Sequence, residues 1–116
     1  MFTDKGVNIN IIEKEEKKSL DNLVRALAAD YMRRQRIIRE GQPARRVRME
    51  LLYLNSKIYE SACEICAPTL ADVFIKEIGE GVGYAKSSVE CVSETTYKLY
   101  KSKIMANIAK KLYLIG

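Results

Sequence analysis

Apolar residues recur along the first part of the chain at the spacing of an α-helix. After Ser19, a favoured N-cap residue, they follow one another three, four or seven positions apart: Leu20, Val24, Leu27, Tyr31 and Ile38. Gly41 and Pro43 supply the usual stop at the far end. The pattern predicts a helix over residues 19–40. Residues 1–18 have a poor period, so we expect a mobile or frayed arm there.

A second, wider apolar stripe follows Pro43, a residue that suits the first turn of a helix. The stripe runs through Val47, Leu51, Leu54, Ile58, Ala62 and Ile65, and Leu52, Tyr59 and Cys66 widen it. A stripe of this width predicts a helix that is buried on two sides. Pro68 breaks the pattern.

The rest of the chain predicts further helices and no strand. A short helix begins near Leu70 and ends at Gly79, and residues 80–84 form a glycine-rich turn. Residues 84–91 can form two helical turns before a long last helix. We therefore expect residues 19–116 to be one all-α domain of four or five helices, which ends in a long C-terminal helix.

Residues 84–116 have the order of a helix-turn-helix, in which small and inward positions precede a capped recognition helix. Ser87, Val89 and Val92 fit the first positions, and Ser93 fits the cap. On this hypothesis Glu94, Thr95 and Lys98 face base edges and Thr96 lies near a phosphate. The alternative is an ordinary helical hairpin.

The composition narrows the chemistry further. The chain has no His and three Cys, which excludes His-based catalytic groups and argues against a secreted disulfide framework. Cys63 and Cys66 lie inside the helical pattern, so we interpret them as buried structural residues rather than a zinc or redox pair. Residues 79–83 lack the Lys-Ser/Thr pair of a phosphate loop. We expect a cytoplasmic protein without cofactor, metal or catalytic site, and not an enzyme.

The net charge of +5 is concentrated in two regions. Seven of the eight arginines lie between Arg33 and Arg48, and six lysines follow Tyr84. Guanidinium groups suit phosphate recognition, although a basic solvated helix face is an equally good interpretation. As phosphate contacts we single out Arg33, Arg36, Arg45, Arg46, Lys98, Lys101 and Lys103.

The last segment resembles a known family. Its residues Ser93-Glu-Thr-Thr-Tyr-Lys-Leu-Tyr-Lys, then Ile104 and Ile108-Ala-Lys-Lys-Leu, are similar to the C-terminal end of the ArpU and RinA type of phage transcriptional regulators. That end is similar to the region 4 helix-turn-helix of sigma factors. The resemblance implies DNA binding by the last helix, and gene regulation in a prophage or mobile element.

Together these observations favour a sequence-specific DNA-binding regulator. Its expected partners are double-stranded DNA, RNA polymerase and a second copy of the chain, joined through the first two helices as a homodimer. No apolar run is long enough to span a membrane. The alternative function is a helical protein interaction or structural module of a phage or plasmid system, in which the wide stripe from Val47 to Ile65 pairs with a partner.

Overall fold

The structure, a computed structural model, describes residues 5–90 and 92–112, with side chains from Glu15 onward. Its elements are α1 (Lys5–Ala29), α2 (Tyr31–Glu40), α3 (Arg45–Cys63), α4 (Pro68–Glu80), the 3-10 turn η1 (Tyr84–Lys86) and α5 (Glu94–Lys111). The described ranges contain no strand. The predicted all-α class and the long C-terminal helix are confirmed. None of the described helices is both long and apolar enough to cross a bilayer.

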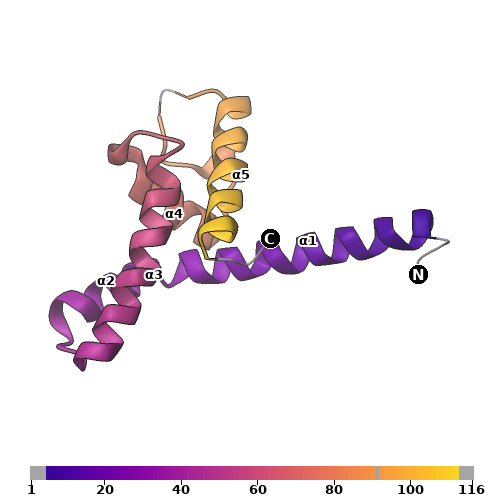
Figure 1. Cartoon of the computed structure of the whole chain (residues 1–116). Helices are drawn as coiled ribbons and strands as arrows, with labels where there is room; N and C mark the ends of the chain where they lie inside the picture. Colours follow the sequence, from indigo (N-terminus) through magenta and orange to yellow (C-terminus); the bar gives the residue numbers. More distant parts are fainter. Residues whose placement is uncertain (1–4, 91, 113–116) are drawn as a thin grey trace.

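The hydrophobic core lies where α4 and α5 pack against the second halves of α1 and α3 (Figure 1). Its fully enclosed side chains come from all four of these helices: Val24, Ile58, Phe74, Ile75, Ile78, Tyr97, Ile104 and Ile108. By contrast, α2 and the first half of α3 form a hairpin that projects from one end of the core (Figure 1). Every residue from 44 to 50 in this hairpin is exposed.

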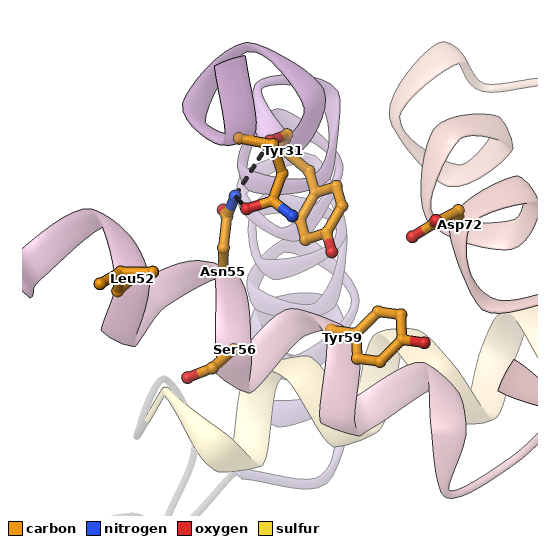
Figure 2. A pocket seen from close by; sticks show the side chains of 7 residues that line it. Tyr31, Leu52, Asn55, Ser56, Tyr59 and Asp72 are labelled. Atoms are coloured by element: carbon orange, nitrogen blue, oxygen red, sulfur yellow. Dashed lines mark hydrogen bonds between the residues drawn. The ribbon is translucent and has the colours of Figure 1, made fainter. Parts of the chain in front are cut away.

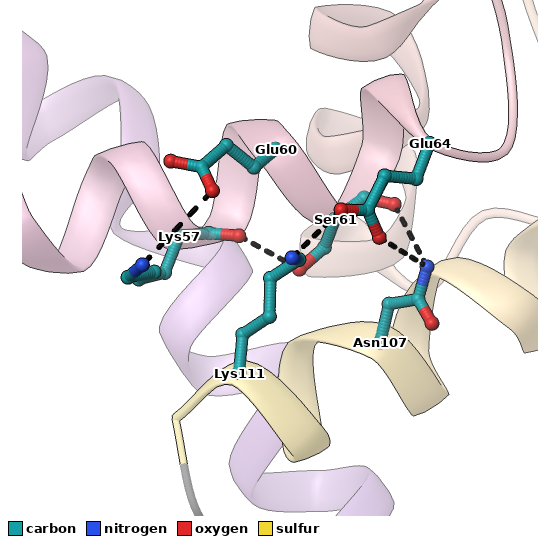
Figure 3. Close-up of polar contacts among 6 residues, drawn as sticks. All are labelled: Lys57, Glu60, Ser61, Glu64, Asn107 and Lys111. Carbon is teal, nitrogen blue, oxygen red and sulfur yellow. Dashed lines mark hydrogen bonds and ion pairs between the residues drawn. The ribbon is translucent and has the colours of Figure 1, made fainter.

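A polar seam joins α3 to α5 beside the core (Figure 3). The Lys111 ammonium lies 2.7 Å from a Glu64 carboxylate oxygen, and this hydrogen bond raises the pKa of Lys111. The Asn107 amide donates to the Ser61 carbonyl at 3.3 Å and to Glu64 at 3.4 Å. The Lys111 side chain thus forms part of the contact between α3 and α5.

The helix predicted over residues 19–40 is divided at Asp30 into the end of α1 and all of α2. Helical backbone also begins at Lys5, whereas the pattern predicted a helix start at Ser19 and an arm before it. Neither Gly nor Pro marks the break. Instead the buried Arg34 guanidinium donates to the Leu27 carbonyl near the end of α1 and to the Asn55 side chain. These contacts satisfy a carbonyl that the end of α1 leaves without a helical partner.

Asn55 of α3 completes this buried junction. Its amide nitrogen donates to the Tyr31 carbonyl at 3.0 Å and to the Gln35 side chain at 3.1 Å. The side-chain oxygen of Asn55 accepts from Arg34. Because all these partners come from a different part of the sequence, the apolar period along residues 19–40 gave no sign of the break.

The end of α4 also differs from the prediction, which stopped this helix at Gly79. The helix continues to Glu80, and Gly81 caps it in the left-handed conformation with φ 71°. Gly79 instead allows a close approach to α1, because a Cβ there would lie 2.5 Å from the Ala29 Cα and 2.6 Å from the Ala29 nitrogen. Two helices can cross this closely only where a side chain is missing.

We predict that Gly79→Ala lowers the free energy of unfolding by about 1–3 kcal/mol, because the added methyl forces α1 and α4 apart. Gly83→Ala is the matched control, since its Cβ would meet nothing within 4 Å and its φ of −92° suits alanine. Urea denaturation followed by circular dichroism measures both. Equal stability of the two variants would contradict the close crossing.

The two helical turns predicted over residues 84–91 are wrong for the part that the structure describes. Only the 3-10 turn η1 forms, and residues 87–90 are not helical. The cause is Glu77 of α4, whose buried carboxylate accepts from the Ser88 N–H at 2.8 Å and from the Ser87 hydroxyl at 2.6 Å. A helix would need that Ser88 N–H to donate to a carbonyl four residues earlier.

Glu77 also accepts from the Tyr97 hydroxyl at 2.7 Å and from the Ser88 hydroxyl at 2.9 Å. Burial by itself raises the pKa of Glu77, but these hydrogen bonds outweigh it and the net pKa lies below its usual value. Burial and the bond to Glu77 raise the pKa of Tyr97 to about 12. An ionised carboxylate with four donors therefore fastens the segment before α5 to both α4 and α5.

Candidate nucleic-acid interface

The arginines between Arg33 and Arg48 divide into two groups in the structure. Arg34 is buried, and its burial lowers its pKa, while its guanidinium stabilises the helix break at Asp30. Arg48 donates to the Ile38 carbonyl at 2.6 Å, near the end of α2. The Arg34 side chain is buried and not available to a partner, whereas Arg48 is exposed and one of its nitrogens is held by the Ile38 carbonyl.

The other five arginines are exposed: Arg33, Arg36, Arg39, Arg45 and Arg46. Arg39 lies 3.6 Å from Glu40 and Arg46 lies 3.5 Å from Glu50, with all four side chains more than 60% exposed. Ion pairs this exposed contribute about 0–1 kcal/mol. We call these five residues the arginine patch. Nothing in the fold requires their charge.

The first turn of α3 adds to this patch. Arg45 and Arg46 lie at the positive end of the helix dipole, and no acidic residue shares that turn. The N-cap, Ala44, offers no side chain to the first backbone N–H groups. Positively charged side chains at this end of a helix destabilise the folded state. Backbone N–H groups that have no capping partner can bind an anion. The hairpin therefore presents a positively charged surface.

The other predicted contacts lie on α5, whose first turn is at the opposite end of the molecule from the hairpin (Figure 1). Glu94, Thr95 and Lys98 are exposed, as the hypothesis requires. However, the Lys98 ammonium lies 2.8 Å from Glu94, so the two charges offset one another. The Ser93 hydroxyl accepts from the Thr96 N–H at 3.1 Å and donates to the Thr96 hydroxyl. Thr96 therefore belongs to the helix cap.

Lys101 and Lys103 occupy different environments. The Lys101 ammonium donates to the Val82 carbonyl at 2.6 Å and lies 5.4 Å from the centre of the Tyr97 ring. Burial, and then the charge of Arg25, lower the pKa of Lys101. Lys103 is exposed, and no described carboxylate forms an ion pair with it. Lys101 thus supports the segment before α5, whereas Lys103 faces solvent.

We predict that Lys101→Ala lowers the free energy of unfolding by about 1–2 kcal/mol, because the Val82 carbonyl loses its partner. Lys103→Ala removes the same charge from the exposed side of α5 and stays within about 0.5 kcal/mol of the parent. Thermal unfolding of both variants checks this. An equal loss of stability in both variants would show that the contact of Lys101 with the Val82 carbonyl does not stabilise the fold.

The helix-turn-helix does not take the predicted form. Its expected first helix is replaced by η1 and residues 87–90, so the helix that precedes α5 is α4. Residues 81–93 connect the two, whereas the usual motif has a turn of about 3–4 residues. The exposed side of α5 still forms a continuous face, made by Thr95, Lys98, Leu99, Ser102, Lys103, Ala106 and Lys110.

Cys63 is the last residue of α3, whereas Cys66 lies in the turn after it and not inside the helix as predicted. Cys66 is buried, its thiol donates to the Ala62 carbonyl at 3.3 Å, and burial raises its pKa. Cys63 is half-buried, and Cys91 lies outside the described residues. Within the described ranges, no three Cys, Asp or Glu side chains come together as metal ligands would.

Comparisons with known protein families, with curated proteins and with solved structures gave no match to this chain. The resemblance of the C-terminal half of the chain to the ArpU and RinA regulators therefore stays a prediction.

Two residues of the site were not singled out from the sequence, although Arg39 was part of the arginine cluster between Arg33 and Arg48. Arg39 belongs to the arginine patch with Arg33 and Arg36, and their regular spacing of three residues was a usable signal. Glu77 gave no such signal, because an acid near the end of a helix is ordinarily a surface residue. Only the packing of α4 against residues 87–97 shows that its carboxylate is enclosed.

Proposed function

We propose that this protein binds double-stranded DNA, with the arginine patch of the α2–α3 hairpin supplying phosphate contacts. The observation that carries the proposal is a set of five exposed arginines on the α2–α3 hairpin, two of which, Arg45 and Arg46, lie in the uncapped first turn of α3. Guanidinium groups bind phosphate through paired hydrogen bonds, and phosphate neutralisation dominates DNA affinity. A projecting hairpin also reaches a duplex without obstruction from the core.

The exposed face of α5 is the second part of the proposal. Thr95, Ser102 and Lys103 can hydrogen-bond to base edges or phosphates, and this face is the one that the family resemblance implies for DNA recognition. The first turn of α5 lies at the far end of the molecule from the hairpin (Figure 1), so we propose that one copy does not place both on the same short site. A homodimer on two half-sites is consistent with that separation. Regulation of phage or mobile-element genes, with contact to RNA polymerase, belongs to this same proposal.

Binding of a labelled random duplex of about 20 base pairs, followed by fluorescence anisotropy, tests the proposal. With about five phosphate contacts, we expect the affinity to fall by about 10²- to 10³-fold between about 50 and 200 mM salt. Poly-glutamate at equal charge concentration should displace the duplex poorly. Absence of duplex binding at the lowest salt would contradict the proposal.

Exposed apolar side chains on the same hairpin favour a second candidate function, a protein interaction module. Large apolar side chains are exposed along the hairpin: Met32, Val47, Met49, Leu52 and Tyr53. Tyrosine and methionine are enriched at protein interfaces. Light scattering discriminates the two functions, because a stable oligomer that retains no duplex at low salt would support the module and contradict DNA binding.

A further inference from the structure

A pocket of about 420 Å³ lies where the hairpin meets the core (Figure 2). Three helices line it, with Tyr31 from α2, Leu52, Asn55 and Tyr59 from α3, and Asp72 from α4. None of its lining residues belongs to the arginine patch or takes part in the proposed DNA contacts. Its polar groups differ in kind from those of the patch, since the lining contains a carboxylate and no arginine or lysine.

Tyr31 provides the first sign of a ligand. Its side chain is almost fully enclosed, with 3% of the residue exposed, yet no described residue forms a hydrogen bond with its hydroxyl. Among the described side chains, every polar atom that is sealed from solvent has a partner. The Tyr31 hydroxyl must therefore reach the open space of the pocket, where Figure 2 shows it pointing away from the backbone of α2.

Asp72 provides the second sign. Its carboxylate points across the pocket toward Tyr31 (Figure 2), and no lysine or arginine of the described chain lies within ion-pair distance of it. Arg34, the nearest buried cation to Tyr31, is already occupied by the Leu27 carbonyl and Asn55. Asp72 is an exposed residue at this pocket, and on a chain with a net charge of +5 its unpaired carboxylate offers a position for an external cation.

The remaining walls suit a flat cation with an apolar tail. Tyr59 presents an aromatic ring beside Asp72 (Figure 2), and guanidinium groups stack on such rings. Leu52 supplies an apolar wall on the other side of the pocket. A guanidinium can donate in parallel to the Asp72 carboxylate and, with another N–H, to the Tyr31 oxygen.

We propose that this pocket binds an alkylguanidinium group, held by the Asp72 carboxylate, the Tyr31 hydroxyl and the Tyr59 ring. Two sources carry this group, a free small guanidine and an arginine side chain of a polypeptide. The recognition chemistry is the same for both. The two sources differ only in the group that the alkyl chain carries outside the pocket.

Titration of the 116-residue chain with butylguanidinium, followed by NMR amide shifts, tests the site. Butylurea is the matched ligand control, because it has the same shape without the charge. We expect saturable shifts of residues around the pocket with butylguanidinium and none with butylurea. Shifts that do not saturate, or that appear equally with butylurea, would overturn the proposal.

Variants make the test specific. Asp72→Asn should weaken butylguanidinium binding about tenfold, within the range for a charged hydrogen bond. Tyr31→Phe should weaken it about threefold. Glu80→Gln removes an equal charge from the exposed end of the same helix and should bind as the parent does. Parent-like affinity of Asp72→Asn would overturn the proposal, and circular dichroism checks that each variant is folded.

A Gly-Arg-Gly peptide with blocked ends identifies the source. Tighter binding of the peptide than of butylguanidinium would support the site and assign it to an arginine of a polypeptide. Tighter binding of butylguanidinium would support the site and assign it to a free guanidine. If neither ligand causes saturable NMR shifts of the pocket amides in the parent protein, the proposal is wrong.

Discussion

The triple variant Arg33→Gln, Arg36→Gln, Arg45→Gln is expected to lose about tenfold in duplex affinity for each phosphate contact removed, at about 0.1 M salt. The three side chains are exposed, and no described carboxylate forms an ion pair with them. Their replacement therefore changes the surface charge and leaves the folding contacts intact. The slope of log affinity against log salt should also fall by about 0.9 for each lost contact.

The control for this experiment must change the net charge equally. Lys18→Gln, Lys76→Gln and Lys86→Gln do so at exposed positions outside the hairpin. We expect this control to retain nearly the parent affinity and slope, measured by fluorescence anisotropy over a range of salt. If the two triple variants lose affinity equally, DNA responds to net charge alone and the arginine patch is not the interface.

The second large effect is expected at Glu77. Glu77→Ala should lower the free energy of unfolding by about 3 kcal/mol or more, because the buried hydroxyls of Tyr97 and Ser87 and the Ser88 N–H all lose their acceptor. Urea denaturation measures this loss. Glu80→Ala, an exposed carboxylate on the same helix, should stay within about 0.5 kcal/mol of the parent.

The same carboxylate makes stability depend on pH. The pKa of Glu77 is lower in the folded protein than its usual value, so its contribution is fully present above the unfolded pKa of about 4.3. The contribution is lost as the pH falls through the folded pKa. Glu77→Gln should remove this part of the acid dependence. Hydrogen exchange of the Ser88 amide should also accelerate, and an unchanged rate would contradict the role of Glu77.

The helices could be predicted from the sequence because each one buries one face. A buried face makes apolar residues recur along the chain with the period of a helix. The stripe from Val47 to Ile65 predicted α3, with Ile58 and Ala62 at its enclosed centre. Ser93 was correctly identified as the cap of α5. The clustering of arginines was also evident, because charge density is a property of the sequence alone.

Helix boundaries and the roles of individual side chains could not be predicted in the same way, because they depend on contacts with residues that are distant in the sequence. The break at Asp30 depends on Asn55, and the shape of residues 84–90 depends on Glu77. Lys101 and Lys103 are equivalent in a charge count, but only Lys101 finds a carbonyl within reach. The sequence could therefore name the basic regions without separating structural cations from exposed ones.

The sequence by itself determined that this chain is all-α, ends in a long capped helix and carries its positive charge in an arginine-rich and a lysine-rich region. Those properties depend on local period, capping and composition. Only the tertiary structure decided that Gly79 lies at a helix crossing, that Glu77 is buried, and that Arg34 alone of the seven clustered arginines is buried. Each of these depends on which surfaces meet in three dimensions, because burial and hydrogen-bond partners are set by packing between distant segments.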